Sequence, residues 1–247
     1  MAEPTQRLEL LCLGVGKGAT HVLRGEPSTA FAVLDGGRPR LLVDCGAGVL
    51  RSCRELLDGA VPRDVYLTHN HMDHTGDLPV AVQVLSALGL PPRLLGHADV
   101  LDIVRRHRLH ELPPSRIDGV EWIEADADGA LHLGGRLGLR LHRSVHSYLC
   151  YGFELLCDGW VLAAYSGDSA YDPGVHGRVA RAPVAVVDGR PAGNHDHASF
   201  DELDTLAARH PDCTFLVVHY EHSDHVFASA NIRLWRTGER VLLPRAA

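Results

Sequence analysis

Histidine and aspartate side chains are concentrated in residues 65–79, where an apolar run continues as Thr-His-Asn-His-Met-Asp-His. Alternate residues of an extended chain face the same side, so His69 and His71 can converge on one metal ion. The chain is then expected to turn into a helix, which directs Asp73 and His74 toward a second ion. Imidazole and carboxylate ligands suit zinc, iron or manganese better than calcium, which prefers oxygen ligands. The segment therefore predicts a metal centre.

A further histidine is needed to complete the first set of ligands. His146 lies between strands predicted over residues 137–141 and 149–156, and we prefer it as the third ligand of the first ion. His142 competes for this place because alternation puts it on the same face.

Two more candidate ligands directly follow predicted strands. Asp168 comes after an apolar run in the sequence Ser-Gly-Asp-Ser, and a short carboxylate has two oxygens that can contact two cations. Its ordinary alternative is a helix cap. His219 follows the last buried strand at once, and we prefer it for the second ion over His222 and His225, which lie deeper in the loop.

Two histidines precede a helix predicted over residues 200–209. Ser199 and Glu202 have the spacing of a capping box at the start of this helix. His195 and His197 therefore lie in the loop before it, where an imidazole can point into a site or simply brace the loop.

The elements that must position these residues follow from hydrophobic periodicity and turn signals. We predict helices over residues 49–57, 77–88, 98–109 and 200–209, the second capped by Asp77. Strands are predicted over residues 8–15, 29–34, 41–43, 64–67, 93–96, 120–124, 131–133, 137–141, 149–156, 160–165, 183–187 and 214–218. The segment from Arg233 to Leu243 is expected to form a hairpin through Thr237 and Gly238. The glycine-rich loop Gly14–Gly18 lacks the spacing of a phosphate-binding loop and is interpreted as a turn.

Composition limits the classes of function. The 247 residues have no internal repeat and suffice for a large core, so we expect one domain over residues 1–247. The net charge of −7 and the absence of long basic runs argue against nucleic acid and membrane surfaces as partners. Six scattered cysteines and an N-terminus without a leader pattern favour reduced thiols and a cytoplasmic location.

The motifs together resemble the metallo-β-lactamase superfamily. The resemblance runs from Leu13-Gly-Val-Gly16 through the His-x-His-x-Asp-His segment and Ser-Gly-Asp-Ser to the terminal histidine. It is closest to the branch of ribonuclease Z-like phosphodiesterases, which includes cyclic phosphodiesterases, because His146 is followed shortly by Tyr151-Gly152-Phe153. It implies an α/β (α+β layered) fold of the αββα type, with two mixed β-sheets flanked by helices.

The resemblance also implies roles for the candidate residues. Asp44, which could otherwise start a turn, supports the ligands from behind. Asp168 bridges the two ions, and Asp73 and His197 are catalytic, with His197 protonating the leaving group. The metal ligands implied are His69, His71, Asp73, His74, His146, Asp168 and His219.

We therefore expect a hydrolase with two divalent metal ions, zinc in the first place and manganese or iron as alternatives. Two cations that share a solvent ligand lower its pKa and provide hydroxide near neutral pH. The stretch between His146 and Asp168 is too short for the arm with which ribonuclease Z holds transfer RNA, so a small phosphodiester, including cyclic ones, is the expected substrate. Hydrolysis of a carboxylic ester, lactone or thioester is the alternative, followed by a mononuclear-iron thiol oxygenase and a non-catalytic metal-binding domain. The resemblance also implies a homodimer.

Overall fold

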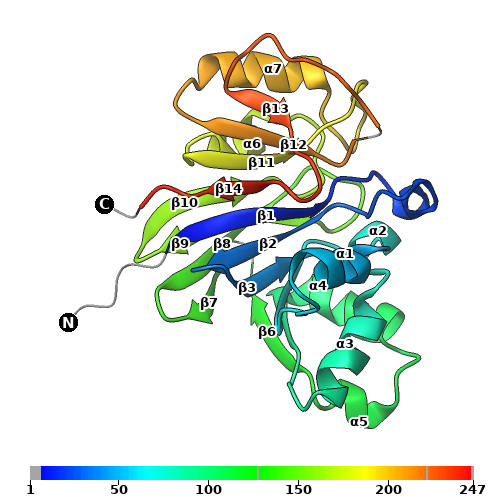
Figure 1. Ribbon diagram of the computed structural model, residues 1–247. Coiled ribbons are helices and arrows are strands. Elements are labelled where there is room, and N and C mark those ends of the chain that lie inside the picture. The colour runs from blue at the N-terminus through cyan, green and yellow to red at the C-terminus, as the bar shows by residue number, and fades with distance from the viewer. Residues whose placement is uncertain (1–6, 127, 221, 246–247) are drawn as a thin grey trace.

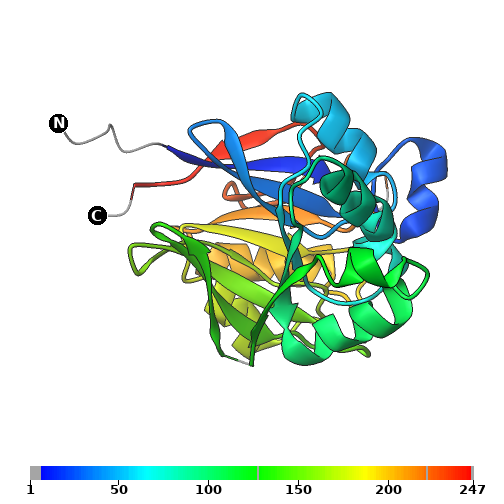
Figure 2. The same ribbon diagram turned by 90° about the horizontal axis from the view of Figure 1, so that it is seen from below.

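Two seven-stranded sheets pack face to face in the computed structural model, which describes residues 7–126, 128–220 and 222–245. Figure 2 shows the sheets one above the other. The strand order is β14-β1-β2-β3-β4-β5-β6 in the first sheet and β13-β12-β11-β10-β9-β8-β7 in the second. The predicted absence of a leader pattern concerns residues that lie mostly outside these ranges.

The first sheet changes from antiparallel to parallel along its strand order. β14, β1, β2 and β3 pair antiparallel, and β3 to β6 pair parallel. Its strands are β1 (Leu8–Gly14), β2 (Ala30–Asp35), β3 (Arg38–Val43), β4 (Asp64–Leu67), β5 (Arg93–His97), β6 (Glu121–Ala125) and β14 (Arg240–Leu242).

The second sheet has the same mixed character. β7 to β10 pair antiparallel, and β10 to β13 pair parallel. Its strands are β7 (Ala130–Gly134), β8 (Leu137–Arg143), β9 (Tyr151–Cys157), β10 (Trp160–Tyr165), β11 (Val184–Asp188), β12 (Thr214–Val218) and β13 (Ile232–Leu234). Because parallel strands point the same way, β10, β11 and β12 bring their carboxyl ends to one edge.

Helices cover the outer faces of both sheets (Figure 1). On the first sheet they are α1 (Val49–Leu56), α2 (Met72–Thr75), α3 (Leu78–Ala87), α4 (Ala98–Ile103), its π-helical continuation η2 (Val104–Arg108) and α5 (Pro114–Ile117). On the second sheet they are α6 (Pro173–Val179) and α7 (Phe200–Arg209), and the 3-10 helix η1 (Ala19–Arg24) follows β1. The predicted αββα layering is confirmed. None of the helices in the described ranges has the length and apolar character needed to cross a membrane.

Strand β1 shows why central strands have continuous apolar sequences. Leu10 and Cys12 belong to the core between the two sheets, whereas Leu11 and Leu13 belong to the core beneath the helices. A strand that is buried on both faces needs apolar residues at successive positions.

Two local predictions were wrong. Residues 232–234 and 240–242 form strands of different sheets, β13 beside β12 and β14 beside β1, so they are not a hairpin. The carboxylate of Asp77 does not cap its own helix α3; it accepts a hydrogen bond of 3.1 Å from the backbone nitrogen of Leu50, in the first turn of α1. Both errors concern partners that are remote in the sequence.

Candidate metal centre

The candidate ligands meet because the strands that precede them end at one edge of the sandwich. β4 precedes His69, β10 precedes Asp168 and β12 precedes His219. His71 is still extended, with φ −71° and ψ 155°, and the chain enters α2 at the next residue. The change from strand to helix therefore separates the directions of the side chains in the His-x-His-x-Asp-His segment, as the spacing predicts.

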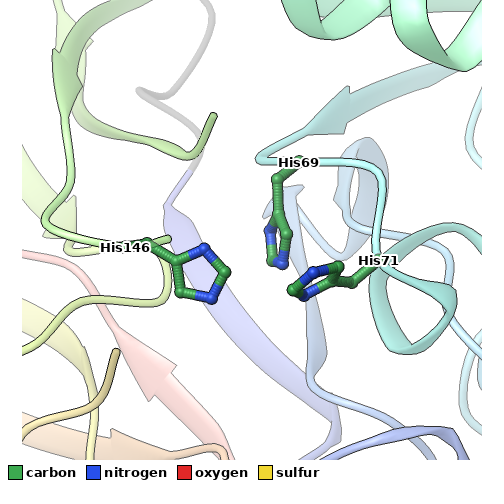
Figure 3. A group of neighbouring side chains, drawn as sticks. All are labelled: His69, His71 and His146. Atoms are coloured by element: carbon green, nitrogen blue, oxygen red, sulfur yellow. The ribbon is translucent and has the colours of Figure 1, made fainter. Parts of the chain in front are cut away.

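Three histidines form the first group. The ligand atoms of His69, His71 and His146 all lie within 4.8 Å of one another. Figure 3 shows the three rings directed toward a common space, with His146 opposite the other two. The ring of His146 is centred 5.0 Å from that of His69 and 5.1 Å from that of His71.

The competing histidine lies elsewhere. His142 is buried in β8, opposite Gly152 of β9, and both of its ring nitrogens are without a hydrogen-bond partner. Burial comes first among the causes that lower the pKa of this imidazole to about 4. Groups of potential metal ligands in the described residues do not include it.

Asp73, His74 and His219 form the second group. The Oδ2 atom of Asp73 lies 3.2 Å from Nε2 of His219 and 3.8 Å from Nε2 of His74. Asp168 connects both groups, because its Oδ2 atom lies 3.3 Å from Nε2 of His74, 3.5 Å from Nε2 of His219 and 3.9 Å from Nε2 of His69. The structure thus brings together the seven residues preferred as ligands in the sequence: His69, His71, Asp73, His74, His146, Asp168 and His219.

Several of these atoms are buried without a hydrogen-bond partner. They are Nε2 of His69, Nε2 of His74 and Oδ1 of Asp168. A buried polar atom without a partner costs about 1–3 kcal/mol, and such atoms are uncommon in folded proteins. Three of them on neighbouring residues, of types that ligate zinc, fit a site built for metal ions.

Asp44 supports the candidate ligand His74 from behind. Its carboxylate lies 2.8 Å from Nδ1 of His74 and accepts hydrogen bonds from the backbone and the hydroxyl of Thr68. The bond to Nδ1 leaves Nε2 of His74 directed toward the site. Asp44 and His219 both have positive φ angles, 60° and 61°. Left-handed backbone is costly for residues other than glycine and is typically retained at functional sites.

Asp188 is a site residue that the sequence did not reveal. Its two oxygens lie 3.2 Å from Nδ1 of His219 and 2.7 Å from Nδ1 of His197, and one of them also accepts a hydrogen bond from the backbone of Ser169. It ends β11, between β10 and β12, so its place at the end of a buried central strand was the available signal. Asp188 orients two imidazoles at once.

The remaining histidines are outside this arrangement. The side chain of His195 is 83% exposed and lies 3.3 Å from Asp196. His222 is exposed, and His225 packs against the rings of Phe200 and Phe227. Like His142, these three histidines belong to none of the ligand groups found among the described residues.

The glycine-rich loop after β1 takes part in the site through its backbone. The nitrogen of Gly18 donates a hydrogen bond of 2.9 Å to Oδ2 of Asp73. Gly16 pairs with Tyr220, the neighbour of His219. This loop therefore braces both ends of the second group of ligands.

Neighbouring carboxylates favour the protonated form of two of the imidazoles in the absence of metal. Burial opposes protonation of His219, but Asp168 and Asp188 raise its pKa to about 9. Burial likewise opposes protonation of His74, and Asp168, Asp44 and Asp73 hold its pKa well above the ordinary value. Burial, together with His74, keeps the pKa of His69 well below that value. Metal ions must displace the protons on His74 and His219 to bind.

Comparison with known proteins agrees with this geometry. Residues 39–220 match the family described as the "Beta-lactamase superfamily domain". No curated protein matches the sequence.

Solved structures share the fold at low sequence identity. The metallo-β-lactamase fold protein YhfI from Bacillus subtilis is 20% identical, with a TM-score of 0.75 over 97% of this chain and 100% of that one. A diphosphatase of the PhnP family is 16% identical, with a TM-score of 0.74 over 96% and 97%. The short form of human tRNase Z is 16% identical, with a TM-score of 0.68 over 96% and 100%.

The matched family covers most of the chain, the two-sheet sandwich is that of the neighbours, and the candidate ligands meet at its edge. The family and the fold predicted from the sequence are therefore confirmed: the chain belongs to the metallo-β-lactamase superfamily.

Proposed function

We propose that the protein is a hydrolase that uses two divalent metal ions to cleave a small phosphodiester, cyclic ones included. The observation that carries the proposal is the pair of ligand groups joined by Asp168, with buried nitrogens and oxygens that lack protein partners. Membership of the superfamily supports metal-dependent hydrolysis.

The residues present suit two ions. His69, His71 and His146 would hold the first, and Asp73, His74 and His219 the second, with Asp168 between them. Nitrogen ligands combined with carboxylates favour zinc, while manganese and iron accept the same ligands. Two bound cations supply Lewis acidity and a water of lowered pKa.

The contacts of His197 support its proposed role in moving a proton. Its Nδ1 atom lies 2.7 Å from Asp188, so the carboxylate fixes the ring and favours a proton on that nitrogen. The Nε2 atom is then free to carry the proton that a leaving group needs. The ring is centred 4.9 Å from that of His219 and 5.8 Å from that of His146, which places it beside both groups of ligands. Such a group contributes about 10²–10⁴-fold to a rate.

A small substrate is favoured over transfer RNA. The chain between His146 and Asp168, all of it described, consists of the short loop 147–150, β9, a turn, β10 and residues 166–167, which leaves no room for a long arm. The net charge of −7 also disfavours a polyanion. Among the neighbours, one is a diphosphatase and another a tRNase Z. All six cysteines are buried and unpaired, which supports the cytoplasm as the proposed location.

Metal analysis and a substrate screen test the proposal. We expect about two ions per chain and turnover of bis(p-nitrophenyl) phosphate, with weaker or no turnover of p-nitrophenyl esters, lactones and thioesters. Turnover of carboxylic esters alone would replace the phosphodiesterase by an esterase. One iron per chain with oxygen uptake would indicate an oxygenase, and two ions without turnover of any substrate would indicate a binding domain.

The proton donor is tested with a pair of variants. His197→Ala should lose more activity on diesters with poor leaving groups than on p-nitrophenyl diesters, which need little protonation. His195→Ala is the matched control, because it removes an exposed imidazole from the same loop and should change neither rate. Equal losses on good and poor leaving groups would contradict the role of His197.

A further inference from the structure

Exposed apolar side chains border the metal centre. Met72, Val145 and Tyr148 have exposed fractions of 59%, 42% and 62%. Met72 directly follows His71, and Val145 and Tyr148 lie on either side of His146 in the chain. We call these three side chains the apolar lip. Exposed apolar area grouped at one place on a protein typically marks a binding surface.

The aromatic member of the lip contacts a candidate metal ligand. The ring of Tyr148 meets that of His71 edge to face, with centroids 4.4 Å apart, and lies 6.2 Å from that of His146. Figure 3 shows His71 and His146 facing each other across the space where the ligand nitrogens converge. Tyr148 therefore borders that space while most of its own surface stays open.

The loop that carries the lip is held in place. Asp196 accepts hydrogen bonds from the backbone nitrogen and the hydroxyl of Ser147, at 2.7 and 3.0 Å. The backbone nitrogen of Val145 donates a hydrogen bond to the hydroxyl oxygen of Ser169, and its carbonyl oxygen accepts one from the backbone nitrogen of Ala170. Because the loop is already ordered, a ligand that packs on it pays little additional conformational entropy.

The position of the lip relative to His197 decides which part of a substrate it meets. His197 lies beside His146 and His219, and the leaving group is protonated there under the proposed function. The ring of Tyr148 instead contacts those of His71 and His146, at the first group of ligands. A substituent that packs on Tyr148 is therefore taken to be the one that His197 does not protonate, which stays on the phosphorus.

We propose that the apolar lip selects phosphodiesters whose retained substituent is a flat aromatic group, which packs on Tyr148. This inference rests on the proposed function. Aromatic contacts prefer offset or edge-to-face geometry, and an exposed ring on a fixed loop offers both.

Two diesters with the same leaving group test the proposal. Bis(p-nitrophenyl) phosphate retains an aryl group after cleavage, and methyl p-nitrophenyl phosphate retains a methyl group. Tyr148→Ala should lower kcat/KM for the aryl diester by roughly tenfold, chiefly through KM, and change that for the methyl diester by less than about twofold. Tyr148→Phe should keep both values.

Trp160→Ala is the matched control. Trp160 is 56% exposed at the start of β10, the end opposite to Asp168, so its removal should change neither rate. Equal losses of kcat/KM on the two diesters in Tyr148→Ala, or no loss on either, would contradict the proposed role of the apolar lip.

A binding measurement separates this inference from the proposed function. If the wild-type protein cleaves neither diester, the proposed function fails, and titration of the metal-loaded protein with phenylphosphonate and methylphosphonate still tests the lip. Phenylphosphonate should bind roughly tenfold more tightly to the wild type than to Tyr148→Ala, while methylphosphonate should bind both equally. Equal affinity of wild type and variant for phenylphosphonate would refute it.

Discussion

Raising the pH should destabilise the metal-free protein, because His219 is held protonated in the folded state. Its pKa rises from 6.5 to about 9 through Asp168 and Asp188, against the effect of burial. A raised folded-state pKa gives stability that is fully present below pH 6.5 and is lost as the pH rises through 9. The shift corresponds to about 3 kcal/mol in full, of which about 2 kcal/mol disappears between pH 6.5 and 8.5.

The other titratable groups leave the range between pH 6.5 and 8.5 suitable for measuring the effect of His219. His74 has a raised pKa and adds a loss in the same direction. His69 and His71 have lowered pKa values, so their contributions change mainly below pH 6.5 and oppose the loss by only about 0.4 kcal/mol each above it. The buried thiols have raised pKa values, so they add to the loss as the unfolded thiols begin to ionise near pH 8.5, equally in the wild type and in the variants.

Urea unfolding of the chelator-treated protein at pH 6.5 and 8.5 measures the effect. The free energy of unfolding should fall by about 2 kcal/mol or more in the wild type. His219→Gln, which cannot ionise, should show a loss smaller by that amount, whereas His225→Gln, an exposed residue outside the site, should keep the wild-type loss. The same pH dependence in wild type and His219→Gln would refute the reasoning. Saturating zinc should abolish the difference, since it displaces the protons.

Three further outcomes follow from single contacts. Asp44→Ala, which frees Nδ1 of His74, should weaken metal binding about 10–100-fold in a competition titration with a chelator. Asp77→Ala, which removes the acceptor at the first turn of α1, should lower the free energy of unfolding by about 1 kcal/mol without changing metal content. Asp196→Ala releases the Ser147 loop beside His146, so it should weaken the first ion more than the second, giving two separated steps in a zinc titration by calorimetry.

The sequence predicts the site well where chemistry and local pattern coincide. β4, β10, β12 and α7 have the predicted bounds, because each has a clear apolar period and clear flanking turns or caps. The ligands follow these strands, so correct strand ends were enough to bring His69, Asp168 and His219 to one edge.

Prediction from the sequence failed where the partner of a residue is remote in the chain. Asp188 has the same local pattern as any aspartate that ends a strand. Only the fold brings to it His219, which follows the neighbouring β12, and His197, from the loop before α7. Asp77 has the local pattern of a cap for α3, yet the nearest backbone donor in space belongs to α1. The sheet to which a short edge strand belongs is likewise decided by packing, not by its own residues.

The separation of β13 from β14 has a consequence for synthesis on the ribosome. β14 pairs with β1, so β1 has no neighbour on one side until residues 240–242 have been translated. Pairing over such a distance in the chain is slow, and an unpaired apolar strand is prone to aggregation meanwhile. The nascent chain should therefore depend on chaperone protection of residues 8–14 until residues 240–242 have left the exit tunnel.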